Sequence, residues 1–165
     1  MNRRGFIRLA AVSPLAAAAA PISQTDHSSQ TSQALSFDVA VIGGSTTGVF
    51  AAVRAAEKGM KVALIENNAL FGGTATAGFV PVWHSMQSLD GSKAVIGGLT
   101  KTILGRLAAR GEAVTHNKNK TPVWRTSSLN VAALSIALDE LVTEHPSITP
   151  MLSTRFVAAA TDRPG

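Results

Sequence analysis

The hydrophobic pattern begins with a short apolar run from Phe37 to Ile42, interrupted only by Asp38. Such a run is typical of a strand that is covered on both faces of a parallel sheet. Apolar residues then recur at intervals of three and four, which predicts an amphipathic helix lying on the sheet: Val49, Ala52, Val53 and Ala56. Gly59 is placed to end this helix in a left-handed cap. A second apolar run, Lys61 to Ile65, completes a predicted strand-helix-strand unit.

Two further helices and a third strand are predicted downstream. Residues 98–110 form the first helix, which stops at Gly111. Asn130 is a favourable N-cap for the second helix, over residues 131–144, and the sequence His145-Pro146 ends it. The buried faces are predicted to be Leu99, Ile103 and Leu107 in the first helix and Val131, Leu134, Leu138 and Leu141 in the second. Residues 148–153 fit a third parallel strand, so the predicted fold class is α/β, a Rossmann-like parallel sheet with flanking helices.

The segments between these elements are less regular. Residues 112–128 are polar and are predicted to form an exposed loop with solvated charges. Asp90-Gly91 is a turn signal. Trp83 and His84 lie in an apolar stretch, where such residues are more often buried packing groups than catalytic groups. For Arg125, contact with an anionic substrate is the less favoured interpretation.

The turn between the first strand and the first helix reads Gly-Gly-Ser-Thr-Thr-Gly. In the G-x-G-x-x-G pattern, the first glycine allows a tight turn, the second lets the backbone approach a pyrophosphate, and the third lets helix and strand pack closely. Gly43 and Gly48 occupy the first and third positions. Ser45 occupies the second, where its Cβ shares space with the phosphates unless Gly44 or a small backbone shift relieves the crowding.

The helix start and the end of the second strand provide further contacts for a dinucleotide. The amides of Thr46, Thr47 and Gly48 are expected to be unpaired, at a helix terminus whose dipole favours an anion. Glu66 ends the second strand, 23 residues after the first glycine, where an acid can accept hydrogen bonds from ribose hydroxyls. Asn67 follows it, and no Arg or Lys is nearby for a 2′-phosphate, so an NADP-type ligand is disfavoured.

Composition excludes several function classes. The 165 residues suffice for one domain, and the formal net charge is +5. Three of the 15 Lys and Arg lie in an N-terminal segment that we expect to be removed; the remaining 12 oppose 10 Asp and Glu, a net of +2. No basic stripe remains, so nucleic acid is not an expected partner. The absence of Cys excludes disulfides, thiolate zinc sites and a Cys nucleophile, and the four scattered His residues indicate no metal site.

The N-terminus has the layout of an export signal. A basic head precedes an apolar stretch from Leu9 to Ala20 and a run of small residues where a peptidase could cut. The apolar stretch is shorter than the roughly 20 residues that a membrane span needs, so no stable span is expected. Arg3-Arg4, followed by Gly5-Phe6-Ile7-Arg8, resembles a bacterial twin-arginine signal. The alternative is a basic, Ala-rich amphipathic or disordered start.

These features predict three regions. Residues 1–20 are a signal peptide whose cleavage point is uncertain within a few residues, and residues 21–36 are a flexible linker rich in Ser, Thr and Gln. Residues 37–165 are the N-terminal part of a cofactor-binding domain. We expect a bacterial protein that the twin-arginine export machinery carries to the periplasm already folded around its cofactor.

A second glycine turn carries a family resemblance. The residues after the strand-end acid include FGGTATAG, from Phe71 to Gly78. This arrangement resembles FAD-dependent oxidoreductases with a nucleotide domain of the glutathione-reductase type. The particular sequence FGGTATAG resembles the bacterial family called FAD-dependent oxidoreductase. The resemblance implies FAD as cofactor, with the Gly-Gly turn beside its pyrophosphate and ribityl chain. The implied cofactor-binding residues are Gly43, Gly44, Ser45, Thr46, Thr47, Gly48, Glu66, Asn67, Gly72, Gly73, Thr74 and Thr76.

The resemblance also bears on the flanking segments. It implies that residues 155–160 begin an antiparallel meander, and that residues 79–85 run under the flavin or belong to the core. FAD domains of this type close with a later strand and a second glycine-acid motif, which this sequence does not contain. We therefore expect a fragment of a longer protein or a truncated product.

The predicted function is transfer of hydride or electrons between an unidentified small organic substrate and the flavin. One alternative is an exported NAD-dependent dehydrogenase, which the Gly72-Gly73 turn disfavours. The other is a non-catalytic, truncated nucleotide-binding fragment. No catalytic acid, base or nucleophile is assigned, because no paired groups occur at a meaningful spacing.

Overall fold

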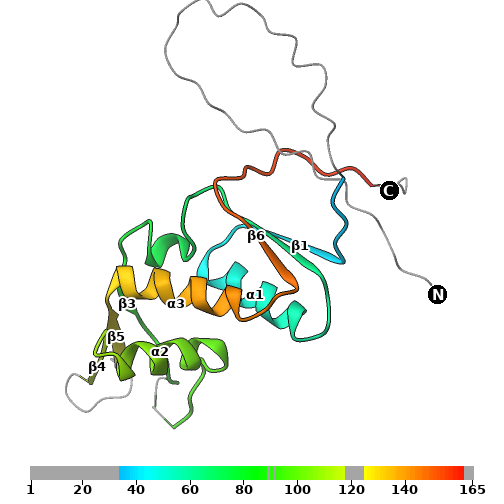
Figure 1. The fold of residues 1–165 in the computed structure, drawn as a ribbon. Helices are drawn as coiled ribbons and strands as arrows, with labels where there is room; N and C mark the ends of the chain where they lie inside the picture. The colour runs from blue at the N-terminus through cyan, green and yellow to red at the C-terminus, as the bar shows by residue number, and fades with distance from the viewer. Residues whose placement is uncertain (1–33, 89, 91, 118–124, 162–165) are drawn as a thin grey trace, which may run out of the picture.

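Three parallel strands form the main sheet of the structure, a computed structural model that describes residues 34–88, 90, 92–117 and 125–161. The strands lie in the order β1-β2-β6, with bounds Val39–Ile42, Val62–Ile65 and Ile148–Met151. In this register Val62 of β2 is opposite both Val39 and Ile148. All three strands end at the same edge of the sheet (Figure 1). The predicted α/β, Rossmann-like fold class is confirmed.

Three helices lie on one side of this sheet (Figure 1). Their bounds are Thr46–Ala56 for α1, Leu99–Ala109 for α2 and Val131–Thr143 for α3. Helix α1 contacts β1 and β2, α3 contacts α1, and α2 contacts α3. The predicted apolar faces are at the centre of the core, where the following side chains are fully buried: Val49, Ala52, Val53, Ile103, Leu107, Leu134 and Leu138.

The central strand β2 is buried on both faces, as its unbroken apolar sequence predicts. Val62 and Leu64 belong to the core cluster formed with the helices, whereas Ala63 and Ile65 are buried outside that cluster. Since side chains alternate along a strand, Ala63 and Ile65 point to the opposite face of the sheet. The segment that follows β6 passes back over that side (Figure 1).

Most predicted helix ends are confirmed in detail. Asn130 caps α3, because its Oδ1 accepts hydrogen bonds from the amides of Ala132 at 3.0 Å and Ala133 at 3.2 Å. Gly59 after α1 and Gly111 after α2 have positive φ angles of 79° and 74°. A side chain with a Cβ is strained in that conformation, which explains why glycine follows each helix.

The prediction of an exposed loop over residues 112–128 is wrong. Strands β4 Ala113–Asn117 and β5 Arg125–Leu129 pair as an antiparallel hairpin, and the short strand β3 Val82–Trp83 adds to β5. Ser127 and Leu129 are buried, and Leu129 belongs to the core cluster. Ser128 between them is more exposed, as expected for side chains that alternate along a strand. Tertiary packing therefore turns a polar sequence into a strand. Residues 118–124 lie outside the described residues.

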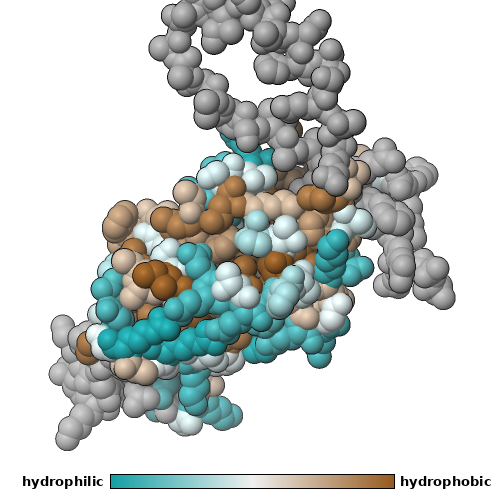
Figure 2. Space-filling view, in the orientation of Figure 1, coloured by the Kyte–Doolittle hydropathy of each residue, from teal (hydrophilic) through white to brown (hydrophobic). Residues whose placement is uncertain are grey.

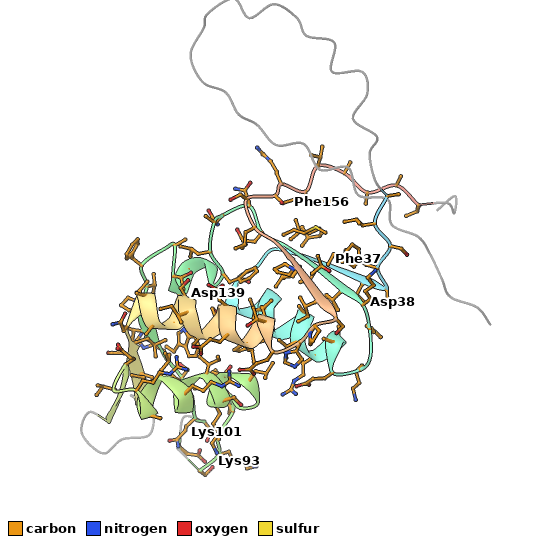
Figure 3. All side chains as sticks on the ribbon, in the orientation of Figure 1. Phe37, Asp38, Lys93, Lys101, Asp139 and Phe156 are labelled. Atoms are coloured by element: carbon orange, nitrogen blue, oxygen red, sulfur yellow. The ribbon has the colours of Figure 1, made fainter. Side chains whose placement is uncertain are left out.

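The prediction of an antiparallel meander over residues 155–160 is also wrong. Residues 154–161 form no strand in the described part of the chain. Their start is tied to the end of β2 instead: the amide of Ser153 donates to the Asn68 carbonyl and that of Thr154 to the Glu66 carbonyl, both at 2.9 Å. Figure 3 places Phe156 of this segment near the sheet, at the far end of the molecule from Lys93 and Lys101.

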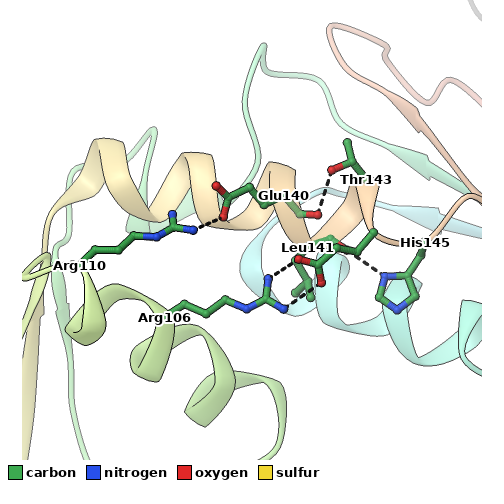
Figure 4. A network of polar contacts seen from close by, with 7 residues as sticks. Arg106, Arg110, Glu140, Leu141, Thr143 and His145 are labelled. Carbon is green, nitrogen blue, oxygen red and sulfur yellow. Dashed lines mark hydrogen bonds and ion pairs between the residues drawn. The ribbon is translucent and has the colours of Figure 1, made fainter.

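Ion pairs join the exposed sides of α2 and α3. Both terminal nitrogens of Arg106 donate to the carboxylate of Glu144, at 2.7 and 2.8 Å, and Arg110 donates to Glu140 at 2.8 Å (Figure 4). Hydrophilic side chains form a band over this part of the surface (Figure 2). The Arg106 hydrogen bond lowers the pKa of Glu144 and raises that of Arg106. None of the described helices is long and apolar enough to cross a membrane.

Candidate functional site

The first turn of α1 presents an unpaired amide at the edge where the parallel strands end. Thr46 and Thr47 are the first helical residues, and the Thr47 amide makes no hydrogen bond within the described part of the chain. The Thr46 amide is directed toward the Gly72 carbonyl by the parallel bridge between Ser45 and Gly72. Ser45 is the N-cap, and its Oγ accepts a hydrogen bond from the amide of Gly48 at 3.3 Å. The expectation of an unpaired Gly48 amide is therefore wrong. Serine is a favoured N-cap residue, and that signal could have revealed the pairing.

A different geometric constraint requires glycine at each of the three positions of the first turn. Gly43 has a φ of +101°. A Cβ on Gly44 would lie 2.5 Å from Cδ1 of Phe71, and a Cβ on Gly48 would collide with the carbonyl oxygen of Gly43. Gly44 thus allows the turn to pack on Phe71, a buried side chain whose role the sequence did not reveal, and Gly48 allows α1 to approach β1.

The two glycine turns pack directly against each other. The amide of Gly72 donates to the carbonyl of Gly44 at 2.8 Å, and Thr46 Oγ1 donates to the carbonyl of Gly72 at 3.3 Å. Gly72 and Gly73 both have positive φ, and a Cβ on Gly73 would lie 3.1 Å from Cβ of Ser45. The short 3₁₀ helix η1, Gly73–Ala75, continues from this contact. The backbone alone fills the space next to Ser45.

Glu66 joins the second strand to the first glycine turn. Its Oε2 accepts a hydrogen bond from the Gly44 amide at 2.7 Å. Its Oε1 accepts two from Asn68, from the amide and from Nδ2, also at 2.7 Å. Since each carboxylate oxygen can accept about two hydrogen bonds, Oε2 keeps room for one further donor. The residue is 7% exposed, so a small part of it is open to a further donor.

Of the remaining predicted site residues, two are exposed and one is buried. Asn67 and Thr74 are exposed beside the two turns. Thr76 is 2% exposed, and its Oγ1 donates to the carbonyl of Phe71 at 2.6 Å, which stabilises the second turn. The hydroxyl proton of Thr76 is therefore already used within the turn. Its direct contact with a cofactor stays a prediction.

A pocket of about 320 Å³ opens beside the first turn of α1. Its apolar wall consists of Phe50, Val82, Trp83, Met86 and Ile96. Its polar wall consists of Thr46, Thr47, His84 and Thr100. Trp83 is half-buried against the core, as expected for a packing residue, whereas His84 is exposed, so its assignment to the core is wrong. Arg125 begins β5, and its side chain lies outside the described residues.

The arrangement suits a dinucleotide pyrophosphate. The unpaired amide of Thr47 and the positive end of the α1 dipole both lie at the start of α1. Gly73 packs against Ser45 so closely that a Cβ on Gly73 would lie 3.1 Å from Cβ of Ser45, so no side chain stands between the two turns there. The residues present therefore fit a cofactor of the FAD type. Among the described residues no group of three or more His, Asp or Glu side chains could hold a metal ion.

Comparison with solved structures gives similarity at the level of the fold. Aquifex aeolicus GidA is 20% identical, with a TM-score of 0.50, over 70% of this chain and 19% of GidA. Thermovibrio ammonificans THI4 is 16% identical (TM-score 0.42; 75% of this chain, 46% of THI4). The p-nitrophenol 4-monooxygenase PnpA from Pseudomonas putida DLL-E4 is 15% identical (TM-score 0.42; 70% and 31%). The chain thus spans less than half the length of these three structures.

The family comparison is more specific. No curated protein sequence matches the chain. The family model described as FAD dependent oxidoreductase matches residues 38–165, which includes both glycine turns and Glu66. This match confirms the predicted family, whose description names FAD as the cofactor. The chain belongs to the FAD dependent oxidoreductase family.

Proposed function

We propose that this chain is the FAD-binding part of an oxidoreductase that transfers hydride or electrons between a small organic substrate and the flavin. The observation that supports this most strongly is the contact between the two glycine turns, where Gly72 donates to the Gly44 carbonyl beside the unpaired Thr47 amide of α1. FAD supplies the ring that accepts or donates the hydride. The residues of this chain bind and orient that cofactor.

Each residue has a stated part in binding. The amide of Thr47 donates to the pyrophosphate, whose charge the α1 dipole also stabilises. Oε2 of Glu66 accepts the remaining hydrogen bond from a ribose hydroxyl. Gly73 packs against Ser45 without a side chain between them, so the ribityl chain passes over the surface that the two turns form together. Asn67 and Thr74 are exposed at the rim of this site.

Flavin binding by the purified chain tests the proposal. We expect FAD to raise the melting temperature and NAD to raise it less, because a ligand that binds only the folded state stabilises that state. Protein that remains colourless after refolding with FAD, and whose melting temperature FAD does not change, contradicts the proposal. A larger shift with NAD favours the dehydrogenase alternative.

A pair of glycine variants locates the site. Gly73→Asp places a carboxylate next to Ser45, and we expect it to weaken FAD binding about tenfold or more through repulsion of the pyrophosphate. Gly59→Asp is the matched control, because Gly59 also has a positive φ but lies after α1 with no atom within 4 Å of an added Cβ. Equal FAD affinity in the two variants contradicts the assigned position.

We also propose that the protein is bacterial and is exported to the periplasm by the twin-arginine route. The support is the sequence Arg3-Arg4-Gly5-Phe6-Ile7-Arg8 before an Ala-rich apolar stretch. Residues 1–33, which contain the predicted signal peptide and most of the linker, lie outside the described residues. Replacing Arg3 and Arg4 with Lys is expected to keep the protein in the cytoplasm in a cell-fractionation assay. Unchanged export of that variant contradicts this route.

A further inference from the structure

The pocket beside α1 adjoins the candidate cofactor site without being part of it. Thr47 belongs to both, since its amide faces the proposed pyrophosphate, and Thr46 and Thr47 line the pocket. The other walls come from segments far away in the sequence, namely β3 with His84 and Met86, and the start of α2. A molecule bound there lies next to the cofactor. Its volume of about 320 Å³ is at the lower end of the range of ligand pockets.

Among the described residues that line the pocket, His84 is the one titratable side chain, and no Lys, Arg, Asp or Glu is present. Its apolar side is formed by Trp83, Phe50, Met86 and aliphatic side chains. A charged ligand would lose its hydration without gaining an ion-pair partner, which is unfavourable. Three polar groups remain available, because the Thr47 and Thr100 hydroxyls and the His84 imidazole make no hydrogen bond within the described residues.

The side of the pocket at His84 and Ile96 is open to solvent, since His84 is exposed and Ile96 is 40% exposed. A substrate must enter and leave in every turnover, whereas a cofactor is retained. The open side therefore favours an exchanging molecule over the flavin ring as the occupant.

We propose that this pocket binds the organic substrate of the oxidoreductase, and that this substrate is an uncharged molecule with a ring and a hydroxyl or carbonyl group. Trp83 and Phe50 contact the ring, and His84 and Thr100 form hydrogen bonds with the oxygen. This assignment rests on the proposed function, because it is the FAD beside α1 that makes the pocket a substrate site.

Intrinsic fluorescence of Trp83 tests the proposal. The 165-residue chain has two tryptophans, so Trp124→Phe in this chain leaves Trp83 as the single reporter. Three probes carry the same ring and differ in charge: benzyl alcohol, benzoate and benzylammonium. We expect benzyl alcohol to change Trp83 emission with an affinity about tenfold or more above those of the two ions, in the presence and absence of FAD.

A pair of neighbouring aspartate variants confines the effect to the pocket. Ile96→Asp places a charge in the wall and is expected to weaken benzyl alcohol binding about tenfold. Val95→Asp is the control, because Val95 is 60% exposed and does not line the pocket. Equal binding by both variants, equal or stronger binding of an ion, or no response of Trp83 overturns the proposal.

A competition experiment with FAD distinguishes failure of the substrate assignment from failure of the proposed function. If FAD and benzyl alcohol bind together, the pocket is a substrate site beside the cofactor. If FAD displaces benzyl alcohol, the pocket holds the flavin ring and the substrate assignment is overturned, while the proposed function stands. If benzyl alcohol binds with the expected selectivity but FAD does not bind, the proposed function fails, and the substrate assignment that rests on it is overturned as well.

Discussion

The amide of Gly44 donates a 2.7 Å hydrogen bond to Oε2 of Glu66, which joins the first glycine turn to the end of the second strand. The other oxygen of the same carboxylate accepts hydrogen bonds from Asn68. An acid that the motif assigns to ribose binding therefore also holds the shape of the site. The shape of this turn therefore depends on the side chain that is predicted to bind the ribose.

Glu66→Gln is expected to lower the free energy of unfolding by about 1–3 kcal/mol. A glutamine has a single acceptor oxygen, so either the buried amide of Gly44 or the partly buried amide of Asn68 would face an NH₂ group instead. Urea denaturation measures the change. Glu57→Gln is the control, since its exposed pair with Arg54 contributes only about 0–1 kcal/mol. If the free energy of unfolding falls by the same amount in both variants, the hydrogen bonds of Glu66 do not contribute to stability.

Gly48→Ala is expected to destabilise the fold by about 3 kcal/mol or more, because the new Cβ collides with the Gly43 carbonyl and forces α1 away from β1. Gly105→Ala is the matched control inside α2. No atom lies within 4 Å of its added Cβ, so alanine is expected to stabilise that helix by about 0.5–1 kcal/mol. Thermal unfolding measures both variants: the melting temperature is expected to fall for Gly48→Ala and to rise for Gly105→Ala. A mild effect of Gly48→Ala would contradict the close approach.

The regular elements could be predicted because their signals are local. Helices α1 and α3 have an apolar face at helical spacing and a capping residue, and β2 is an unbroken apolar run. Strands β4 and β5 carry no such signal, since they are polar and are stabilised by pairing with each other and by Leu129 in the core. Sequence pattern alone does not reveal a strand whose stability comes from its partners.

The candidate site shows the same division. The glycines and Glu66 could be predicted, because a dinucleotide-binding turn requires fixed spacings along the chain. The capping of Gly48 by Ser45 and the bond from Thr76 to the Phe71 carbonyl were not predicted. The first is a local N-cap that the preference for serine could have revealed. The second lies within the second glycine turn, whose conformation no sequence pattern specified. His84 directly follows β3, a short strand added to the hairpin that the sequence did not indicate.

Asn130→Ala is expected to cost about 1 kcal/mol of stability, because the amides of Ala132 and Ala133 lose their acceptor at the start of α3. Asn130→Asp retains a side-chain oxygen at the same position and is expected to keep most of that stability. Chemical denaturation of both variants makes the comparison. Equal destabilisation by the two substitutions would assign the effect to something other than the cap.

Arg106→Met is expected to raise the pKa of Glu144 toward its ordinary value, since the Arg106 hydrogen bond is the largest cause of its lowering. A carboxyl with a lowered folded-state pKa contributes stability above its unfolded pKa, and that contribution is lost as pH falls through the folded pKa. The side chains are 30% and 47% exposed, so the stability difference at pH 7 is expected to be at most about 1 kcal/mol. It should disappear at pH values below the titration of Glu144. NMR titration of the carboxyl measures the pKa directly, and an unchanged pKa in the variant contradicts the pairing.

Two aspartates are expected to titrate in opposite directions from their common reference value of 3.8. Hydrogen bonds from Ser88 and Ser92 lower the pKa of Asp90 to about 2, in the turn between Gln87 and Ala94, whereas burial raises the pKa of Asp139 on α3. The turn at Asp90 is therefore stabilised above the unfolded pKa and loses that support as pH falls toward about 2. The sign is reversed for Asp139, because a raised folded-state pKa favours folding at low pH.

Ser88→Ala separates the two groups. Removing the hydroxyl that donates to Asp90 Oδ1 at 2.6 Å is expected to move the pKa of Asp90 up toward 3.8 and to leave that of Asp139 unchanged, since the two residues lie on different elements. Carboxyl-detected NMR across the acid range resolves both titrations in one sample. If Asp90 titrates at its ordinary value in the unmodified protein, the hydrogen bonds of this turn do not persist in solution. If both pKa values move in the variant, the substitution has changed the fold and not only the turn.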